Sequence, residues 1–151
     1  MQLSASIIIS MNTLSLISDF PLKTYDKVRY HDTDRQGHVN NAVFSSFLET
    51  GRVEILYNPD VPLNSQDTSF VIASLKLDFL HEAEWPGLVE IGTGVSRIGN
   101  SSVVFHQQLF QRGVCVAKAE TVIVQVYNDK SGSAPLSDEA RRALGRWVMD
   151  V

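Results

Sequence analysis

The chain has 151 residues, of which 44% are hydrophobic and 20% are charged, and its formal net charge is −4. A chain of this length and composition is expected to fold as one globular domain with its own core. The acidic balance, with no basic run, argues against nucleic acid as the partner. Cys115 is the only cysteine, which excludes an intramolecular disulfide and suits a reducing, cytoplasmic setting.

The first eighteen residues are apolar in part but follow no regular pattern. Their uninterrupted apolar run, Ile7-Ile8-Ile9, is too short to cross a bilayer, and no Lys or Arg precedes it as in a secretory signal. We therefore expect a poorly specified extension over 1–18, a single domain over 19–151 and no membrane span.

The first regular elements are a strand ending over 27–30 and, after a polar loop, a long helix. Over 43–57 apolar residues recur at helical spacing, and Asn58-Pro59 ends the helix. Asn40 or Asn41 is the predicted N-cap, because an Asn side chain can accept a hydrogen bond from the free amides of the first turn.

The rest of the chain favours strands, separated by short turns and followed by a short helix opened by Ser137. The predicted strands are 69–79, 88–98, 101–110 and 114–127. Short turns imply antiparallel pairing of consecutive strands, so we expect a meander of these four. The order predicts an α+β fold, in which an antiparallel sheet of about five strands wraps around one long helix.

The segment from Tyr30 to Ala42 carries two carboxylates, two histidines and two asparagines directly before the predicted helix. Helix N-termini offer free backbone N–H groups to a developing oxyanion. Asp34 could act there as a general base or a nucleophile on a polarised carbonyl. On residue type alone it could equally cap the loop.

The run D-T-D-x-x-G-H-V-N-N-A, Asp32 to Ala42, resembles the signature of the hotdog-fold acyl-CoA thioesterases of the 4-hydroxybenzoyl-CoA thioesterase-like superfamily. A second match starts at Gly87 and includes the R-I-G-N-S-S segment from Arg97 to Ser102. The resemblance covers about residues 22–148. It implies the hotdog fold, hydrolysis of acyl-CoA, and a homodimer or homotetramer.

The resemblance also implies roles for single residues. Asp34 corresponds to the catalytic carboxylate of the family, and the backbone N–H at Asn41 corresponds to its oxyanion donor. His38 could assist the reaction or only fix the loop. Glu49 is a second catalytic candidate, because a helix glutamate is catalytic in some branches; alternatively, it forms an exposed ion pair with Arg52.

Substrate contacts are expected from both matching segments. The first segment supplies Gly37 and the helix that follows it supplies Phe44, and both would lie close to the acyl group. The second supplies Arg97, Gly99 and Ser101, which could bind the phosphates of coenzyme A through charge and backbone amides. We expect neither a metal nor a redox cofactor. Coenzyme A itself is part of the substrate.

Two other functions stay open. The ending His38-Val39-Asn40-Asn41 resembles acyl-carrier-protein thioesterases, which carry Asp, Asn and His at the positions of Asp34, Gln36 and His38. Their further acidic residue has no counterpart in the strand that follows the helix. A non-catalytic acyl-CoA binding module is the alternative from another class.

Overall fold

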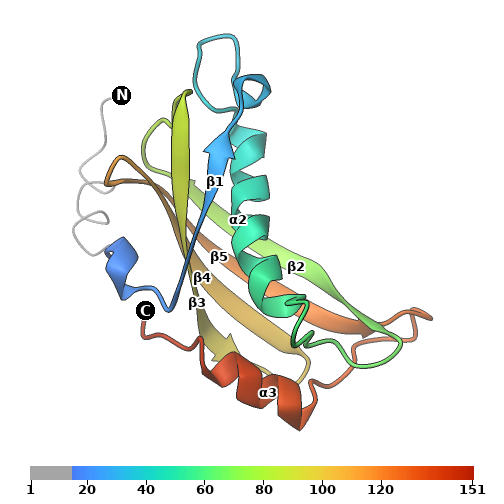
Figure 1. Ribbon diagram of the computed structural model, residues 1–151. Helices are drawn as coiled ribbons and strands as arrows, with labels where there is room; N and C mark the ends of the chain where they lie inside the picture. The colour runs from blue at the N-terminus through green and yellow to red at the C-terminus, as the bar shows by residue number, and fades with distance from the viewer. Residues whose placement is uncertain (1–14) are drawn as a thin grey trace.

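The computed structural model describes residues 15–151 (Figure 1). Of the extension predicted over 1–18, residues 1–14 lie outside this range, so most of that prediction is not addressed. The described chain opens with a short 3-10 turn, η1 (Ile17–Asp19). No helix within residues 15–151 is both long enough and apolar enough to cross a bilayer.

One antiparallel sheet wraps around one long helix, α2 (Asn41–Leu56), and a short helix, α3 (Asp138–Gly145), lies at the far end of α2 (Figure 1). The strands are β1 (Leu22–Val28), β2 (Thr68–Phe79), β3 (Gly87–Ile98), β4 (Ser102–Gln111) and β5 (Val114–Tyr127). The predicted α+β hotdog architecture is confirmed.

The order of the strands corrects the predicted four-strand meander. The sheet runs β1-β3-β4-β5-β2, so only β3, β4 and β5 form a meander, and β2 lies at the other edge beside β5. The reason is that β1 occupies the free edge of β3, with Leu22 opposite Thr93 and Val28 opposite Gly87. The first strand also ends at Val28, and residues 30–32 form a 3-10 turn, η2 (Tyr30–Asp32).

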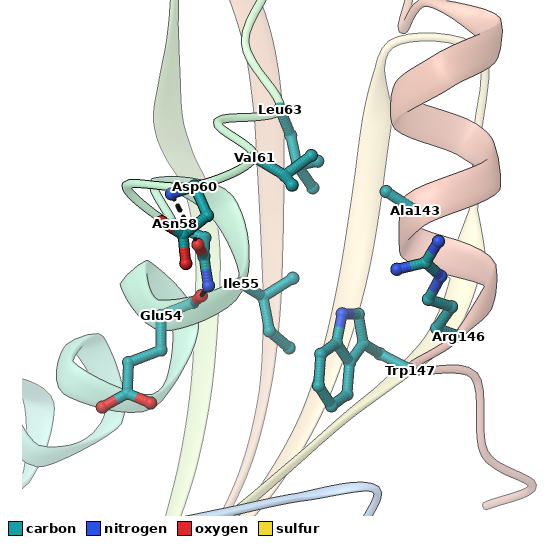
Figure 2. Close-up of a pocket in the computed structure, with 9 residues that line it drawn as sticks. All are labelled: Glu54, Ile55, Asn58, Asp60, Val61, Leu63, Ala143, Arg146 and Trp147. Atoms are coloured by element: carbon teal, nitrogen blue, oxygen red, sulfur yellow. Dashed lines mark hydrogen bonds between the residues drawn. The ribbon is translucent and has the colours of Figure 1, made fainter.

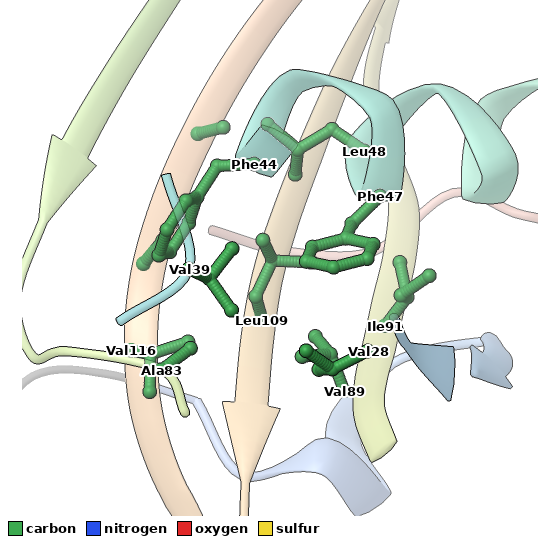
Figure 3. Close-up of a cluster of buried hydrophobic side chains, with 12 residues drawn as sticks. Val28, Val39, Phe44, Phe47, Leu48, Ala83, Val89, Ile91, Leu109 and Val116 are labelled. Atoms are coloured by element: carbon green, nitrogen blue, oxygen red, sulfur yellow. The ribbon is translucent and has the colours of Figure 1, made fainter. Parts of the chain in front are cut away.

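Helix α2 forms where the apolar spacing predicts it, and Asn40 is its N-cap. The Oδ1 atom of Asn40 accepts a hydrogen bond from the N–H of Ala42 at 3.0 Å. The buried face of the first two turns packs into the concave face of the sheet, as Figure 3 shows. This core contains, among others, Phe44, Phe47, Leu48, Val89, Ile91 and Leu109.

The backbone of α2 approaches the sheet most closely at Gly51. A Cβ atom there would lie 2.8 Å from Nε2 of Gln107 and 2.9 Å from Cγ2 of Ile91, and it would collide with the hydroxyl of Thr93. The Nε2 group of Gln107 also donates to the carbonyl of Leu48 at 2.9 Å and to Oγ1 of Thr93 at 2.9 Å. Gly51 therefore lets the helix pack closely against the buried, hydrogen-bonded side chains of Gln107 and Thr93.

We expect Gly51→Ala to lower the free energy of unfolding by about 1–2 kcal/mol, because overpacking a core typically costs about 1–3 kcal/mol. Helix propensity alone predicts the opposite sign, a gain of about 1 kcal/mol. Urea titration followed by circular dichroism measures the difference.

Gly145→Ala is the matched control, since Gly145 is also helical and a Cβ there meets nothing within 4 Å. It should be neutral or stabilising. An equal response of the two variants would contradict close packing at Gly51.

Candidate active site

The carboxylate of Asp34 is held by the amides of its own loop. Its Oδ1 atom accepts hydrogen bonds from the backbone N–H of Gln36 at 2.8 Å and of His38 at 3.2 Å. The backbone N–H of Asp34 donates to the carbonyl of His38 at 2.8 Å, and a β-bridge joins Thr33 to Val39. The second carboxylate oxygen has no partner among residues 15–151. The side chain is exposed, so this oxygen is accessible.

A glycine makes this tight loop possible. The N–H of Gly37 donates to the carbonyl of Asp34 at 3.1 Å, and its φ is +82°. A side chain would strain the backbone in that region, whereas glycine adopts it freely. Gly37 therefore shapes the loop, and its predicted contact with substrate stays a prediction.

The imidazole of His38 is oriented by a residue that the sequence did not indicate. Its Nε2 atom lies 3.0 Å from Oε2 of Glu82. A backbone β-bridge between His38 and Glu84 joins the loop to the segment before β3, and it brings the side chain of His38 next to that of Glu82. His38 is 28% exposed, so part of the ring stays open to a ligand.

The first turn of α2 leaves a backbone donor free directly after this loop. The N–H groups of Ala42 and Val43 bond to the N-cap Asn40, through its side chain and its carbonyl. The N–H of Asn41 has no acceptor among residues 15–151. A free N–H at the positive end of a helix suits an oxyanion.

The side chain of Asp32 is buried between the end of β1 and the start of α2. It is 2% exposed, and its Oδ2 atom accepts from the backbone N–H of Arg29 at 2.7 Å. Its carbonyl accepts from the N–H of Asn40 at 2.8 Å. Asp32 therefore ties the strand end to the residue that caps α2.

Of the two helix residues predicted for the site, Phe44 is 2% exposed and packs edge to face on Phe79, with ring centroids 5.1 Å apart. Glu49 lies on the exposed side of α2. The alternative of an exposed Glu49–Arg52 ion pair is wrong, because Arg52 is 6% exposed and donates to Gln107 and Thr121. Burial lowers the pKa of Arg52, and the charge of Glu49 acts in the opposite direction.

The predicted coenzyme A residues Arg97, Gly99 and Ser101 do not meet Asp34 within one chain. They lie at the β3–β4 turn, while Gly87 at the other end of β3 is close to the loop of Asp34. Twelve residues of strand separate these ends by up to roughly 36 Å. The carbonyl of Gly99 instead accepts from Arg141 of α3 at 2.7 Å.

A pocket of 220 Å³ also lies at the end of α2 away from Asp34 (Figure 2). It is lined by residues of α2, the loop that follows and the C-terminal segment, among them Ile55, Leu63, Arg146 and Trp147. None of the predicted site residues lines it.

The sulfur of Cys115 is buried, and desolvation raises the pKa of its thiol, which disfavours the nucleophilic thiolate. Within residues 15–151, no three His, Cys, Asp or Glu side chains gather in a way that could hold a metal ion.

Comparison with known proteins places the chain in a family. Residues 28–144 match the thioesterase-like superfamily. The acyl-CoA thioesterase YbgC of Haemophilus influenzae is 27% identical over 129 residues, which cover 83% of this chain and 92% of that protein. Two solved structures are also similar.

The first is a predicted thioesterase from Bacillus stearothermophilus, with TM-score 0.77 and 30% identity, covering 85% of this chain and 97% of that one. The second is a Thermus thermophilus thioesterase complexed with coenzyme A and Zn, with TM-score 0.71 and 28% identity, covering 83% and 92%. With the hotdog sheet, the carboxylate loop and these matches in agreement, the chain belongs to the thioesterase-like superfamily and is a thioester hydrolase.

Proposed function

We propose that this protein hydrolyses acyl-CoA thioesters to the free carboxylic acid and coenzyme A, with Asp34 as the catalytic carboxylate. The observation that carries the proposal is the Asp34 carboxylate, pinned by loop amides through one oxygen and open at the other, directly before the free N–H of Asn41. The names of the relatives support acyl-CoA as the substrate. Neither a metal nor a redox cofactor takes part in the proposed reaction.

Two routes use these groups. With Asp34 as the base, the carboxylate takes a proton from water while the water oxygen attacks the thioester carbonyl carbon. The N–H of Asn41 donates to the resulting oxyanion. Collapse of the tetrahedral intermediate breaks the C–S bond, and the sulfur of coenzyme A receives the proton. With Asp34 as the nucleophile, its oxygen forms a mixed anhydride, the thiolate leaves, and water hydrolyses the anhydride.

The first test is the release of free thiol from short, long and aromatic acyl-CoAs by the wild type and by Asp34→Asn. The asparagine keeps the Oδ1 acceptor of the loop but can neither take a proton nor attack. We expect kcat to fall by about a thousandfold, within the range that general base catalysis supplies.

Asp129→Asn is the matched control, since the Oδ1 atom of Asp129 also accepts from the amide two residues on, that of Ser131, at 2.8 Å. Its turnover should equal that of the wild type. Full turnover by folded Asp34→Asn would disprove the proposed catalytic role. Faster turnover of acyl carrier protein thioesters than of acyl-CoA would reassign the substrate, and tight binding without turnover would indicate a binding module.

We further propose that His38 positions water or the thioester and that Glu82 orients the imidazole. His38→Ala should lower kcat by about 10–100-fold, and Glu82→Gln should lower it by less than tenfold, because the imidazole is still present. Steady-state kinetics with the preferred acyl-CoA measures both.

Glu84→Gln serves as the control in the same segment, because the carboxylate of Glu84 faces Arg112, at 3.7 Å. It should leave kcat unchanged. If Glu82→Gln and Glu84→Gln have the same effect, the His38–Glu82 contact does not contribute.

We also propose that the working form is a homodimer or a homotetramer. The β2 edge of the sheet has no neighbouring strand among residues 15–151, and Val71 and Ile72 on it are 43% and 52% exposed. Such an edge presents free N–H and C=O groups that another chain can pair with. Sedimentation velocity at micromolar concentration should give a dimer or tetramer; a monomer that is fully active would contradict this proposal.

A further inference from the structure

An exposed apolar face follows the open edge of β2 and the end of α2. It consists of Val53 and Tyr57 on the helix side and Ile72 on the strand, each between 38% and 52% exposed, while Val71, 43% exposed, extends from the opposite face of the same edge. The occupant that fits both an open strand and its flanking apolar side chains is a second copy of this chain. Two identical edges can pair antiparallel about a two-fold axis, which buries the same face of both copies.

The register of this pairing is limited by Tyr57. Its hydroxyl accepts a hydrogen bond from the backbone N–H of Phe70 at 2.9 Å, so this donor is no longer available to another strand. The free edge therefore extends from Val71 to Phe79. A two-fold pairing of that segment sets Val71 of one copy opposite Phe79 of the other and, because a bulge between Ile72 and Ser74 adds one residue, is centred between Leu75 and Lys76.

Two aromatic contacts, together with this register, indicate where Tyr57 of the second copy lies. Tyr57 packs edge to face on Phe70 near the start of β2, with ring centroids 5.7 Å apart. Phe44 packs in the same way on Phe79 at the end of β2. Because the two-fold axis reverses the strand, Tyr57 of the second copy comes to lie beside the Phe44–Phe79 pair of the first.

The charges on α2 fit the same arrangement. Arg52 is nearly fully buried, and no carboxylate among residues 15–151 lies within ion-pair distance of it. A buried charge without a counterion is costly. When Phe44 of one copy is level with Tyr57 of the other, Glu49 is level with Arg52 of the other. The exposed carboxylate of the second copy then adds its charge to that of Glu49 in the same chain, while the guanidinium keeps its hydrogen bonds to Gln107 and Thr121.

We propose that Tyr57 of each copy forms a wall of the acyl pocket of the other copy and limits the length of the acyl group. This inference rests on the proposed thioesterase function. Phe79 is 42% exposed and packs on Phe44 in the first turn of α2, which starts at Asn41, so a ring of the second copy packed against Phe79 lies at the acyl side of the thioester. The hydroxyl of Tyr57 accepts a hydrogen bond from the backbone N–H of Phe70, which holds the ring in place. An acyl chain would contact the apolar surface of this ring.

Subunit complementation tests the placement. Tyr57→Ala should lower kcat/KM for the preferred acyl-CoA at least tenfold and shift the preference toward longer acyl chains, whereas Tyr57→Phe should keep the wild-type preference. Asp34→Ala and Tyr57→Ala chains with different affinity tags are co-expressed, and the heterodimer is isolated by tandem purification. One of its sites carries both substitutions and the other carries neither.

We expect the heterodimer to show about half the wild-type activity. Activity no higher than the mean of the two parent homodimers would overturn the inference, as would full activity of Tyr57→Ala. A wild type that hydrolyses no thioester would instead refute the proposed function. That outcome can be told apart from a wrong position of Tyr57, because cross-linking tests this position without any enzymatic activity.

This second test uses a bifunctional reagent. In a Cys115→Ala background, chains with Ser45→Cys are mixed with chains with Tyr57→Cys and treated with a short bismaleimide. Within one chain, twelve helical residues separate these positions by about 18 Å, beyond the reach of the reagent. A covalent dimer that forms in the mixture, and in neither chain alone, supports the placement. Its absence in a protein that sediments as a dimer contradicts it.

Discussion

The close docking of α2 on the sheet at Gly51 is the constraint on which the rest of the structure depends. A helix that carried a side chain there would stand further from Thr93 and Gln107 and could not share the hydrogen bonds of Gln107. The docking fixes the axis of α2, and the axis fixes where its N-terminal N–H groups point. A packing contact in the middle of the helix thereby sets the geometry of the site at its end.

The site itself is built from very local structure. One carboxylate oxygen of Asp34 closes the loop through two backbone amides, and Asp32 ties the end of β1 to the N-cap of α2. Because these bonds join residues close together in the chain, the loop and the helix start form one unit. The interactions hold the carboxylate and leave one of its oxygens without a partner among residues 15–151, as a carboxylate would need in order to attack a carbonyl or to take a proton from a water next to it.

What the sequence predicted follows from this locality. The loop, Asn40 as one of two possible caps, and the five strands depend on spacing over a few residues, and these predictions are confirmed. The place of β2 in the sheet depends on which strand reaches the edge of β3 first, and no local pattern carries that information. Glu82 was missed for the same reason, since its contact with His38 forms only after the chain has passed through α2 and β2.

The two segments predicted to bind substrate, the loop of Asp34 and the β3–β4 turn, lie at opposite ends of the sheet of one chain. The β3–β4 turn, with Gly99 and Ser101, lies at the α3 end of the sheet, and the loop between β1 and α2, which holds Asp34, lies at the opposite end (Figure 1). In the proposed dimer, a two-fold axis at the β2 edge exchanges these ends, so the Arg97–Ser101 turn of one copy and Asp34 of the other would lie at the same end. A substrate as long as acyl-CoA, with its phosphates far from its thioester, needs contacts spread over such a distance. The separation within one chain is therefore compatible with the predicted phosphate contacts if the site is shared by two copies, as proposed.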